Sequence, residues 1–247
     1  MKNVCAVVLA AGKGSRMKSE LPKVLHEING KPLIIFSLQT LQSLKLSQFI
    51  SVVKHRADLV VPVIKSYSDV AFQGDEYGTA KAVEASLPKL NDDIDTVMVI
   101  NGDDSMFYSK KTFEEVLKKH QDEKNTITFI TLLKENPTGY GRVVYDKTGN
   151  FQKIVEQKDA TDEQKEIKEV NDGVYIFNRK FLEEKIANLA PSPVTGEYYL
   201  TDLINVAIEH NKKVGTYLLP NSLEFFGVST QQDIQQANQL YSSVKNI

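Results

Sequence analysis

The sequence has 247 residues, 41% of them hydrophobic and 25% charged, which is typical of a soluble globular protein with a full core. Its formal net charge of -2 argues against a general nucleic-acid binder, which needs a cationic surplus to contact phosphates. The single cysteine, Cys5, excludes an intramolecular disulfide and a cysteine-based zinc site.

Two further expectations follow from the apolar segments. Cys5 lies in the apolar run of residues 4–9, so we expect it in the core. No apolar run approaches the roughly 20 residues that a membrane span needs, so we expect a cytoplasmic protein without membrane contacts.

The first half of the chain alternates between strand and helix patterns. Apolar runs rich in Val and Ile predict buried strands at residues 4–10, 49–54, 69–73 and 95–101. Helical spacing predicts helices at residues 32–44, 57–67 (with Pro62 disturbing it), 79–90 and 110–124. This alternation predicts an α/β fold of Rossmann-like type, with a mostly parallel mixed sheet between two helix layers. Ligands of such sheets bind beyond the carboxyl ends of the strands.

The pattern changes after residue 125 and predicts a smaller, β-rich part. Strands are expected at residues 126–134, 141–146, 151–156, 169–178 and 213–220, with a short one at 225–229. Helices are expected at residues 181–189, 199–210 and from 231 onward, and the charged stretch 157–170 is interpreted as a solvated loop or lid edge. We expect one domain, with a nucleotide-binding half (about 1–125), a sugar-binding half (about 126–230) and a C-terminal helix (231–247).

The loop after the first strand reads "LAAGKGSRMKSELPK" and matches neither common glycine motif. A P-loop ending at Gly12-Lys13 would need glycine where Val7 stands and Ser or Thr where Gly14 stands. The dinucleotide fingerprint fits Gly12 and Gly14 but then meets Met17. Small residues nevertheless let backbone amides approach a phosphate, and the lysines and arginine add positive charge. The loop is therefore interpreted as a phosphate-binding loop rather than a simple turn.

This opening resembles the signature of the sugar-1-phosphate nucleotidyltransferases, L-A-A-G-x-G-[ST]-R-M followed by a P-K lysine. Further segments resemble motifs of the same family in the same order: "FQGDEYGTAKAV", "NGDDSMF", "GYGRVV", "KIVEQKDAT", "VNDGVY", "GEYYLTDLI" and "FFGVST". Together they cover about residues 4–235. The sequence is most similar to the uridyltransferase half of the bifunctional bacterial enzymes that make UDP-N-acetylglucosamine.

The resemblance implies roles for individual residues. It implies catalytic roles for Arg16, Lys23 and Asp103, with Arg16 and Lys23 neutralising phosphate charge and Asp103 holding Mg²⁺. The implied nucleotide-binding residues are Leu9, Ala10, Ala11, Gly12, Gly14, Gln73, Gly78 and Thr79, of which Gln73 would read the uracil edge. The implied sugar-binding residues are Gly102, Gly141, Glu156 and Asn171. These residue types suit the chemistry, since Mg²⁺ prefers oxygen ligands and an amide can both donate to and accept from a pyrimidine.

Three positions depart from the family pattern. Ser229 stands where the family has a metal-binding asparagine, so it is the second implied metal ligand, although a weaker one. Asp172 replaces a threonine close to the expected sugar site, and Asp104 adds an acid next to Asp103. We interpret Asp104 as a loop residue rather than an outer-sphere partner of the metal.

The implied reaction joins UTP and N-acetylglucosamine 1-phosphate into UDP-N-acetylglucosamine and pyrophosphate. Two alternatives remain: another hexose 1-phosphate with UTP, dTTP or CTP, or a weakened nucleotide-sugar sensor. Small-molecule substrates are the expected partners. The sequence lacks the hexapeptide repeats that follow in the bifunctional enzymes, so acetyl transfer and a trimer built on such repeats are not expected.

Overall fold

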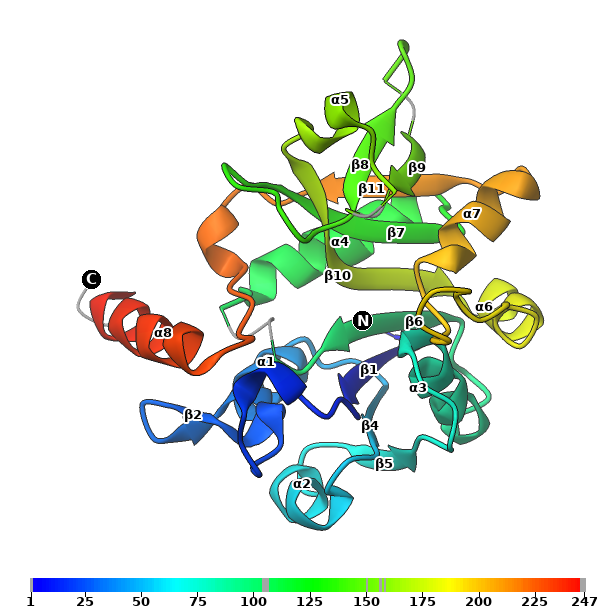
Figure 1. The fold of residues 1–247 in the computed structure, drawn as a ribbon. Helices are drawn as coiled ribbons and strands as arrows, with labels where there is room; N and C mark the ends of the chain where they lie inside the picture. The colour runs from blue at the N-terminus through cyan, green and yellow to red at the C-terminus, as the bar shows by residue number, and fades with distance from the viewer. Residues whose placement is uncertain (1, 104–106, 150, 156, 158, 245–247) are drawn as a thin grey trace.

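The computed structural model describes residues 2–103, 107–149, 151–155, 157 and 159–244 (Figure 1). The first half of the chain alternates strands and helices, as its pattern predicts. In chain order its main elements are β1 (Val4–Ala10), α1 (Leu33–Ser43), β4 (Gln48–Val53), α2 (Ala57–Ile64), β5 (Asp69–Phe72), α3 (Thr79–Ser86), β6 (Thr96–Asn101) and α4 (Lys110–Asp122). Short 3-10 turns lie at Ser15–Met17, Lys23–Leu25 and Leu87–Lys89.

The second half contributes most of the antiparallel pairing. Its elements are β7 (Ile127–Leu133), β8 (Arg142–Tyr145), β9 (Phe151–Val155), α5 (Asp162–Lys165), β10 (Glu169–Asn178), α6 (Arg179–Ile186), α7 (Asp202–Glu209), β11 (Val214–Leu218), a 3-10 turn (Ser222–Glu224) and α8 (Gln231–Val244). Strands β8 and β9, with α5, extend from the upper end of the molecule in Figure 1.

One sheet runs through both halves in the order β11-β7-β10-β6-β1-β4-β5, and β8 and β9 branch from β10. Strands β1, β4, β5 and β6 pair in parallel, as do β7 and β11, whereas β10 runs antiparallel to both β6 and β7. The predicted Rossmann-like fold with a mostly parallel mixed sheet is therefore confirmed.

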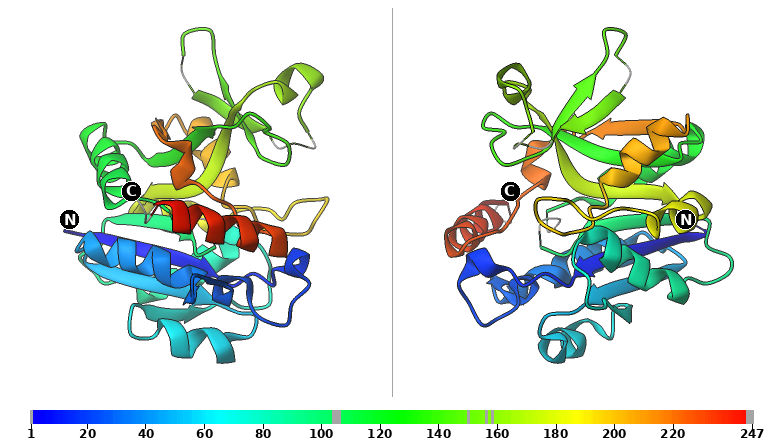
Figure 2. Two further views of the ribbon diagram at one scale, coloured as in Figure 1. Left: turned by 90° about the vertical axis from the view of Figure 1, so that its left-hand side faces the viewer. Right: turned by 45° about the vertical axis from the view of Figure 1, so that its right-hand side comes forward.

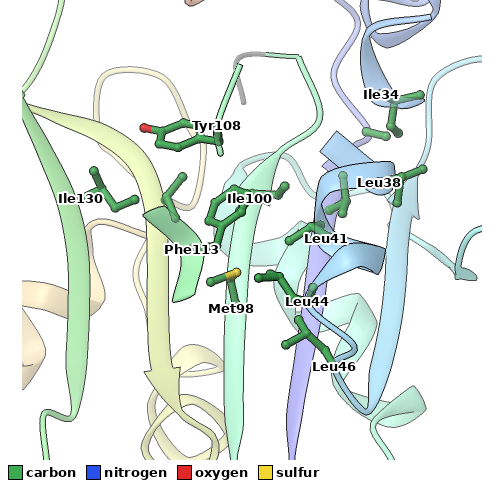
Figure 3. Close-up of a cluster of buried hydrophobic side chains, with 14 of the residues drawn as sticks. Ile34, Leu38, Leu41, Leu44, Leu46, Met98, Ile100, Tyr108, Phe113 and Ile130 are labelled. Carbon is green, nitrogen blue, oxygen red and sulfur yellow. The ribbon is translucent and has the colours of Figure 1, made fainter. Parts of the chain in front are cut away.

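Successive side chains of β1 point to opposite faces of the sheet, which explains why the sheet lies between two helix layers. All seven residues of β1 are buried. Val4, Ala6, Val8 and Ala10 belong to one apolar cluster with α1, α2 and α4, whereas Cys5, Val7 and Leu9 belong to a second cluster with α3, α6 and α7. Figure 3 shows part of the first cluster, in which leucines of α1 lie near Met98 and Ile100 of β6.

The single cysteine has the core position predicted for it. Cys5 is fully buried, and burial raises the pKa of its thiol to about 12. Among the described residues, no helix has both the length and the apolar content needed to cross a membrane.

Three local features differ from the sequence prediction. The stretch 157–170 is not only a loop, because it contains α5, which begins with a capping box between Thr161 and Gln164. Residues 225–229 form no strand. A small hairpin of β2 (Glu27–Ile28) and β3 (Lys31–Pro32) was not predicted; Asn29 and Gly30 turn it with positive φ angles of 51° and 73°.

The C-terminal helix α8 packs against the N-terminal loops, as both views of Figure 2 show. Its residues Ala237 and Tyr241 join a third apolar cluster with Met17 and Phe36, in which the rings of Phe36 and Tyr241 are 5.4 Å apart. The amide of Asn29 also donates to the Asn238 side chain (2.8 Å). This helix therefore supports the loop that follows β1.

Candidate functional site

A cavity of about 480 Å³ opens beyond the carboxyl ends of β1 and β6, where ligands of such sheets bind. Four segments line it: β1 with the loop after it, the end of β6, the loop between β5 and α3 with the start of α3, and the segment before α7. The lining residues are Leu9, Ala10, Ala11, Gly12, Lys13, Gly14, Lys23, Val24, Gln73, Tyr77, Gly78, Thr79, Ala82, Asn101, Asp103 and Glu197. Ten of the sequence-predicted site residues are in this set.

The loop after β1 brings small residues and cations to the cavity. Gly14 has a φ of +60°, and a Cβ there would lie 2.7 Å from the Cβ of Lys23. The amide of Met17 donates to the carbonyl of Gly14 (2.8 Å) and closes a turn. Glycine at this position thus allows the chain to turn tightly against Lys23, which lines the cavity together with Lys13.

The end of β6 places Asp103 beside the same loop. The amide of Gly102 donates to the carbonyl of Leu9 (2.9 Å), and a Cβ on Gly102 would lie 3.1 Å from that oxygen. This close approach brings Asp103 to Lys23, and the carboxylate and the ammonium form an ion pair. A carboxylate and a cation therefore lie in contact on the cavity wall.

The loop after β5 presents Gln73. The Gln73 side-chain amide donates to the carbonyls of Glu76 (2.9 Å) and Gly78 (3.3 Å), which leaves its oxygen as an acceptor. Gly78 has a φ of +115°, and a Cβ there would lie 2.2 Å from the carbonyl oxygen of Tyr198. The Thr79 hydroxyl accepts from the amide of Leu200 (2.9 Å). The close backbone approach at Gly78 and the hydrogen bond at Thr79 therefore hold this loop against the segment before α7.

Several predicted site residues lie outside the cavity lining. Arg16 is exposed in the turn Ser15–Met17. Ser229 precedes α8, and its amide donates to the Asp233 carboxylate (2.7 Å). Gly102, Gly141 and Asn171 are also not among the lining residues. Glu156, predicted to bind the sugar, and Asp104 lie outside the described residues.

Two of the predicted sugar-binding residues meet in the second half of the chain. The amide of Asn171 donates to the carbonyl of Gly141 (3.0 Å). The Asn171 side-chain amide donates to the Tyr175 hydroxyl (2.6 Å), whereas its buried oxygen Oδ1 has no hydrogen-bond partner within the described part of the chain. The register of β10 shifts between Asn171 and Tyr175. Asn171 Oδ1 is therefore a buried acceptor next to this irregularity, without a donor among the described residues.

Asp172 is buried next to this irregularity. Its carboxylate accepts hydrogen bonds from the Tyr108 hydroxyl and from the amide of Val174 (2.8 Å). Burial raises its pKa to about 7, and the two hydrogen bonds oppose that rise. The acid that replaces the family's threonine is therefore held inside the protein by two donors.

Some lining residues were not among the predicted site residues. Tyr77 precedes the predicted Gly78, Asn101 precedes Gly102, and Glu197 begins the "EYYLTD" part of a recognised motif. Lys13, Val24 and Ala82 complete this group. Their positions within or next to the motif segments were the only signal in the sequence. Which residues of such a segment face a cavity depends on the loop conformation.

The donor set is compatible with Mg²⁺. Asp103 offers carboxylate oxygen at the cavity, and no group of three His, Cys, Asp or Glu able to hold a metal occurs within the described residues. Mg²⁺ commonly uses only one or two protein carboxylates and takes its other ligands from water and substrate phosphates. A site that depends on Asp103 and a polyphosphate therefore fits this ion.

Comparison with known families agrees with this geometry. The model of the family described as nucleotidyl transferase matches residues 5–241. Bifunctional protein GlmU of Streptococcus suis is 38% identical over 229 residues, which are 93% of this chain and 50% of that protein. GlmU of Acetivibrio thermocellus is 37% identical over 243 residues, 98% of this chain and 52% of that protein. The chain thus spans about half the length of the curated relatives it matches.

A solved structure supports the fold. A Bacillus anthracis protein, assigned as a glucose-1-phosphate thymidylyltransferase and solved in complex with sucrose, superposes with a TM-score of 0.79. The match covers 96% of this chain and 94% of that protein, at 19% sequence identity. At this identity the similarity establishes the shared architecture.

Proposed function

The chain belongs to the nucleotidyl transferase family, and from this premise we propose that it is a sugar-1-phosphate uridyltransferase. The proposed reaction is UTP plus N-acetylglucosamine 1-phosphate, giving UDP-N-acetylglucosamine and pyrophosphate. Its substrates are small metabolites of the cytoplasm, which is the proposed location.

The observation that carries this proposal is the meeting of three loops at one cavity. Gln73 comes from the loop after β5, Lys23 from the segment after β1, and Asp103 from the end of β6. A nucleoside triphosphate needs the same three elements: a polar group for its base, cations for its phosphates and a carboxylate for its metal ion. The small residues Ala11 and Gly12 line the cavity between them and leave room for the nucleotide.

The remaining hydrogen-bonding capacity of Gln73 supports a uracil or thymine base. Because its side-chain NH₂ group is committed to the carbonyls of Glu76 and Gly78, its oxygen is left to accept a hydrogen bond. Uracil and thymine carry an N–H donor at N3, whereas N3 of cytosine is an acceptor. This difference favours UTP or dTTP over CTP, and the similarity to GlmU proteins favours UTP.

Asn171 supports a sugar ligand. Its buried oxygen Oδ1 lacks a partner among the described residues. A buried acceptor without a donor lowers the stability of the folded protein, and a bound ligand that supplies the donor removes this cost. The N–H of an acetamido group and the hydroxyl groups of any hexose are donors of the required kind, so the preference for an N-acetylated sugar rests on the similarity to GlmU proteins. Gly141, whose carbonyl binds the Asn171 amide, and Glu156 complete the proposed sugar-binding set.

The proposed chemistry is an in-line displacement by a phosphate oxygen of the sugar 1-phosphate at the α-phosphorus of UTP. That phosphate is already ionised at neutral pH, so no general base is needed. Lys23 and Arg16 orient the phosphates and stabilise negative charge that develops on them. Mg²⁺, held by Asp103, with Ser229 as a weaker proposed ligand, would supply additional neutralisation of the pyrophosphate leaving group.

A pyrophosphate-release assay over a panel of substrates tests this proposal. The panel combines UTP, dTTP, CTP, ATP and GTP with the 1-phosphates of N-acetylglucosamine, glucose and galactose, in the presence of Mg²⁺. We expect the highest kcat/KM with UTP and N-acetylglucosamine 1-phosphate. Higher kcat/KM with another pair would reassign the substrates, and binding of a UDP-sugar without turnover of any pair would favour a sensor.

A further inference from the structure

Lys54 lies just after β4 and holds the loop that carries Gln73. Its ammonium donates to three consecutive carbonyls, those of Gly74, Asp75 (2.9 Å) and Glu76 (3.3 Å). An ammonium group has three N–H donors, so these bonds use all of them. Residues 73–78 belong to no helix or strand, and this cation supplies hydrogen bonds that regular structure would otherwise provide.

The same ammonium also lies against an aromatic ring of the cavity wall. Nζ of Lys54 is 3.8 Å from the ring centroid of Tyr77, and Nζ of Lys13 is 5.5 Å from it. Both distances are within the range of cation–π attraction. Tyr77 is 48% exposed and lines the cavity. The ring is thus within cation–π distance of a lysine of the loop after β1 and of the lysine that holds the Gln73 loop.

One shared carbonyl connects Lys54 to the side chain of Gln73. The carbonyl of Glu76 accepts hydrogen bonds both from Lys54 Nζ and from the Gln73 side-chain amide. The orientation of that amide therefore depends on a carbonyl whose position Lys54 fixes. Losing Lys54 would remove a donor from that carbonyl and a cation from the Tyr77 ring, and would leave the Gln73 amide bonded to carbonyls that are less firmly placed.

On the basis of the proposed function, we propose that Lys54 and Tyr77 determine the affinity and base selectivity of the nucleotide subsite. Lys54 is a positioning residue, which keeps the Gln73 oxygen directed at the N3–H of the pyrimidine. Tyr77 provides an aromatic surface on the cavity wall against which the base packs, a contact that nucleic-acid bases readily make with aromatic side chains. Neither residue is expected to touch the reacting phosphates.

The test compares substitutions at both positions by calorimetric titration with UTP and Mg²⁺ and by steady-state kinetics. Lys54→Met keeps the aliphatic chain but removes the donors and the charge, and we expect it to weaken UTP binding about 10-fold. Tyr77→Leu should weaken binding about 5-fold, and Tyr77→Phe, which restores the ring, should recover most of that loss. The KM for the sugar 1-phosphate and the kcat should change less than about 3-fold in these variants.

Base selectivity and a matched lysine variant separate this role from a merely structural one. Lys54→Met should lower the ratio of UTP to CTP affinity, because the Glu76 carbonyl that orients the Gln73 amide then loses the donor that fixes it. Lys168→Met is the control, since Lys168 pairs with Glu135 on the surface and lies outside the cavity lining. It should leave UTP affinity and selectivity unchanged.

The possible failures are distinguishable. Three results for Lys54→Met would overturn the inference and leave the proposed function intact. They are unchanged UTP binding, an equal loss of affinity for UTP and CTP, and an equal increase in the KM values for UTP and for the sugar 1-phosphate. If the unmodified protein prefers another nucleotide, the same variants are compared with that nucleotide. If it binds none, the proposed function and this inference fall together.

Discussion

The ammonium of Lys23 and the carboxylate of Asp103 form an ion pair, although one follows β1 and the other follows β6. Their side chains are only 16% and 19% exposed, so the pair is largely shielded from water. The proposed mechanism assigns the cation to substrate phosphate and the carboxylate to a metal ion. Binding of a metal–nucleotide complex would therefore replace this ion pair with two new ones.

Removing either partner should abolish most turnover. We expect Lys23→Ala and Asp103→Ala each to lower kcat by about 100-fold or more, because each removes charge stabilisation from the transition state. Pyrophosphate release measures the rate, and thermal unfolding with circular dichroism verifies that the fold persists. Near-normal turnover in a folded variant would refute the assigned role of that residue.

The ion pair also predicts how the protein binds a divalent ion in the absence of nucleotide. Lys23 competes with a metal for the Asp103 carboxylate, so Lys23→Met should bind Mn²⁺ about 2- to 5-fold more tightly than the unmodified protein. Titration followed by electron paramagnetic resonance reports free Mn²⁺ directly. Asp103→Asn provides the control, because it should weaken binding; equal affinity in all three proteins would contradict this competition.

Gly78 should tolerate no side chain. Its φ of +115° is unfavourable for other residues, and a Cβ would lie 2.2 Å from the carbonyl oxygen of Tyr198. We expect Gly78→Ala to lower the free energy of unfolding by about 2–4 kcal/mol, as measured by urea denaturation. Gly74→Ala in the same loop is the matched control, because a Cβ there meets nothing within 4 Å. A similar effect of both substitutions would argue against this steric account.

Asp172 should make stability depend on pH. Burial raises its pKa in the folded protein to about 7 from an ordinary value of 3.8, so the folded state retains a proton that the unfolded state releases. Stability from this group is present below pH 3.8 and is lost as the pH rises to about 7.

Asp172→Asn removes this dependence and should therefore stabilise the protein at pH 8 relative to the unmodified chain. The gain should be about 1–3 kcal/mol, and it should shrink towards zero or reverse near pH 4. Denaturant unfolding at both pH values measures it. A gain of the same size at both pH values would show that the ionisation of Asp172 is not the cause.

Much of the fold could be predicted because strands that are buried on both faces consist almost entirely of apolar residues. The runs of Val and Ile in β1 and β6 are buried on both faces, which requires the apolar continuity that marked them as strands. The α5 helix was missed because its four residues carry no apolar periodicity, and only the Thr161–Gln164 capping box signals it. The β2–β3 hairpin has two residues in each strand, too few to show alternation.

The candidate site could be predicted in part for a similar reason. Motif residues with special backbone requirements, such as Gly14 and Gly78, line the cavity together with Lys23 and Asp103. Contacts that depend on side-chain direction could not be predicted. Lys54 and Tyr77 are 23 positions apart, and nothing in the sequence indicates that the ammonium of one lies over the ring of the other.

The order of strands in the sheet has a consequence for synthesis of the protein. Strand β6 pairs with β1 on one side and with β10 on the other, and β10 ends at residue 178. While the ribosome is still adding the residues between them, one backbone edge of the apolar β6 strand has no partner. Such edges invite pairing with other chains. Fragments that end near residue 125 should therefore aggregate or recruit chaperones, and soluble expression should require the chain at least through β10.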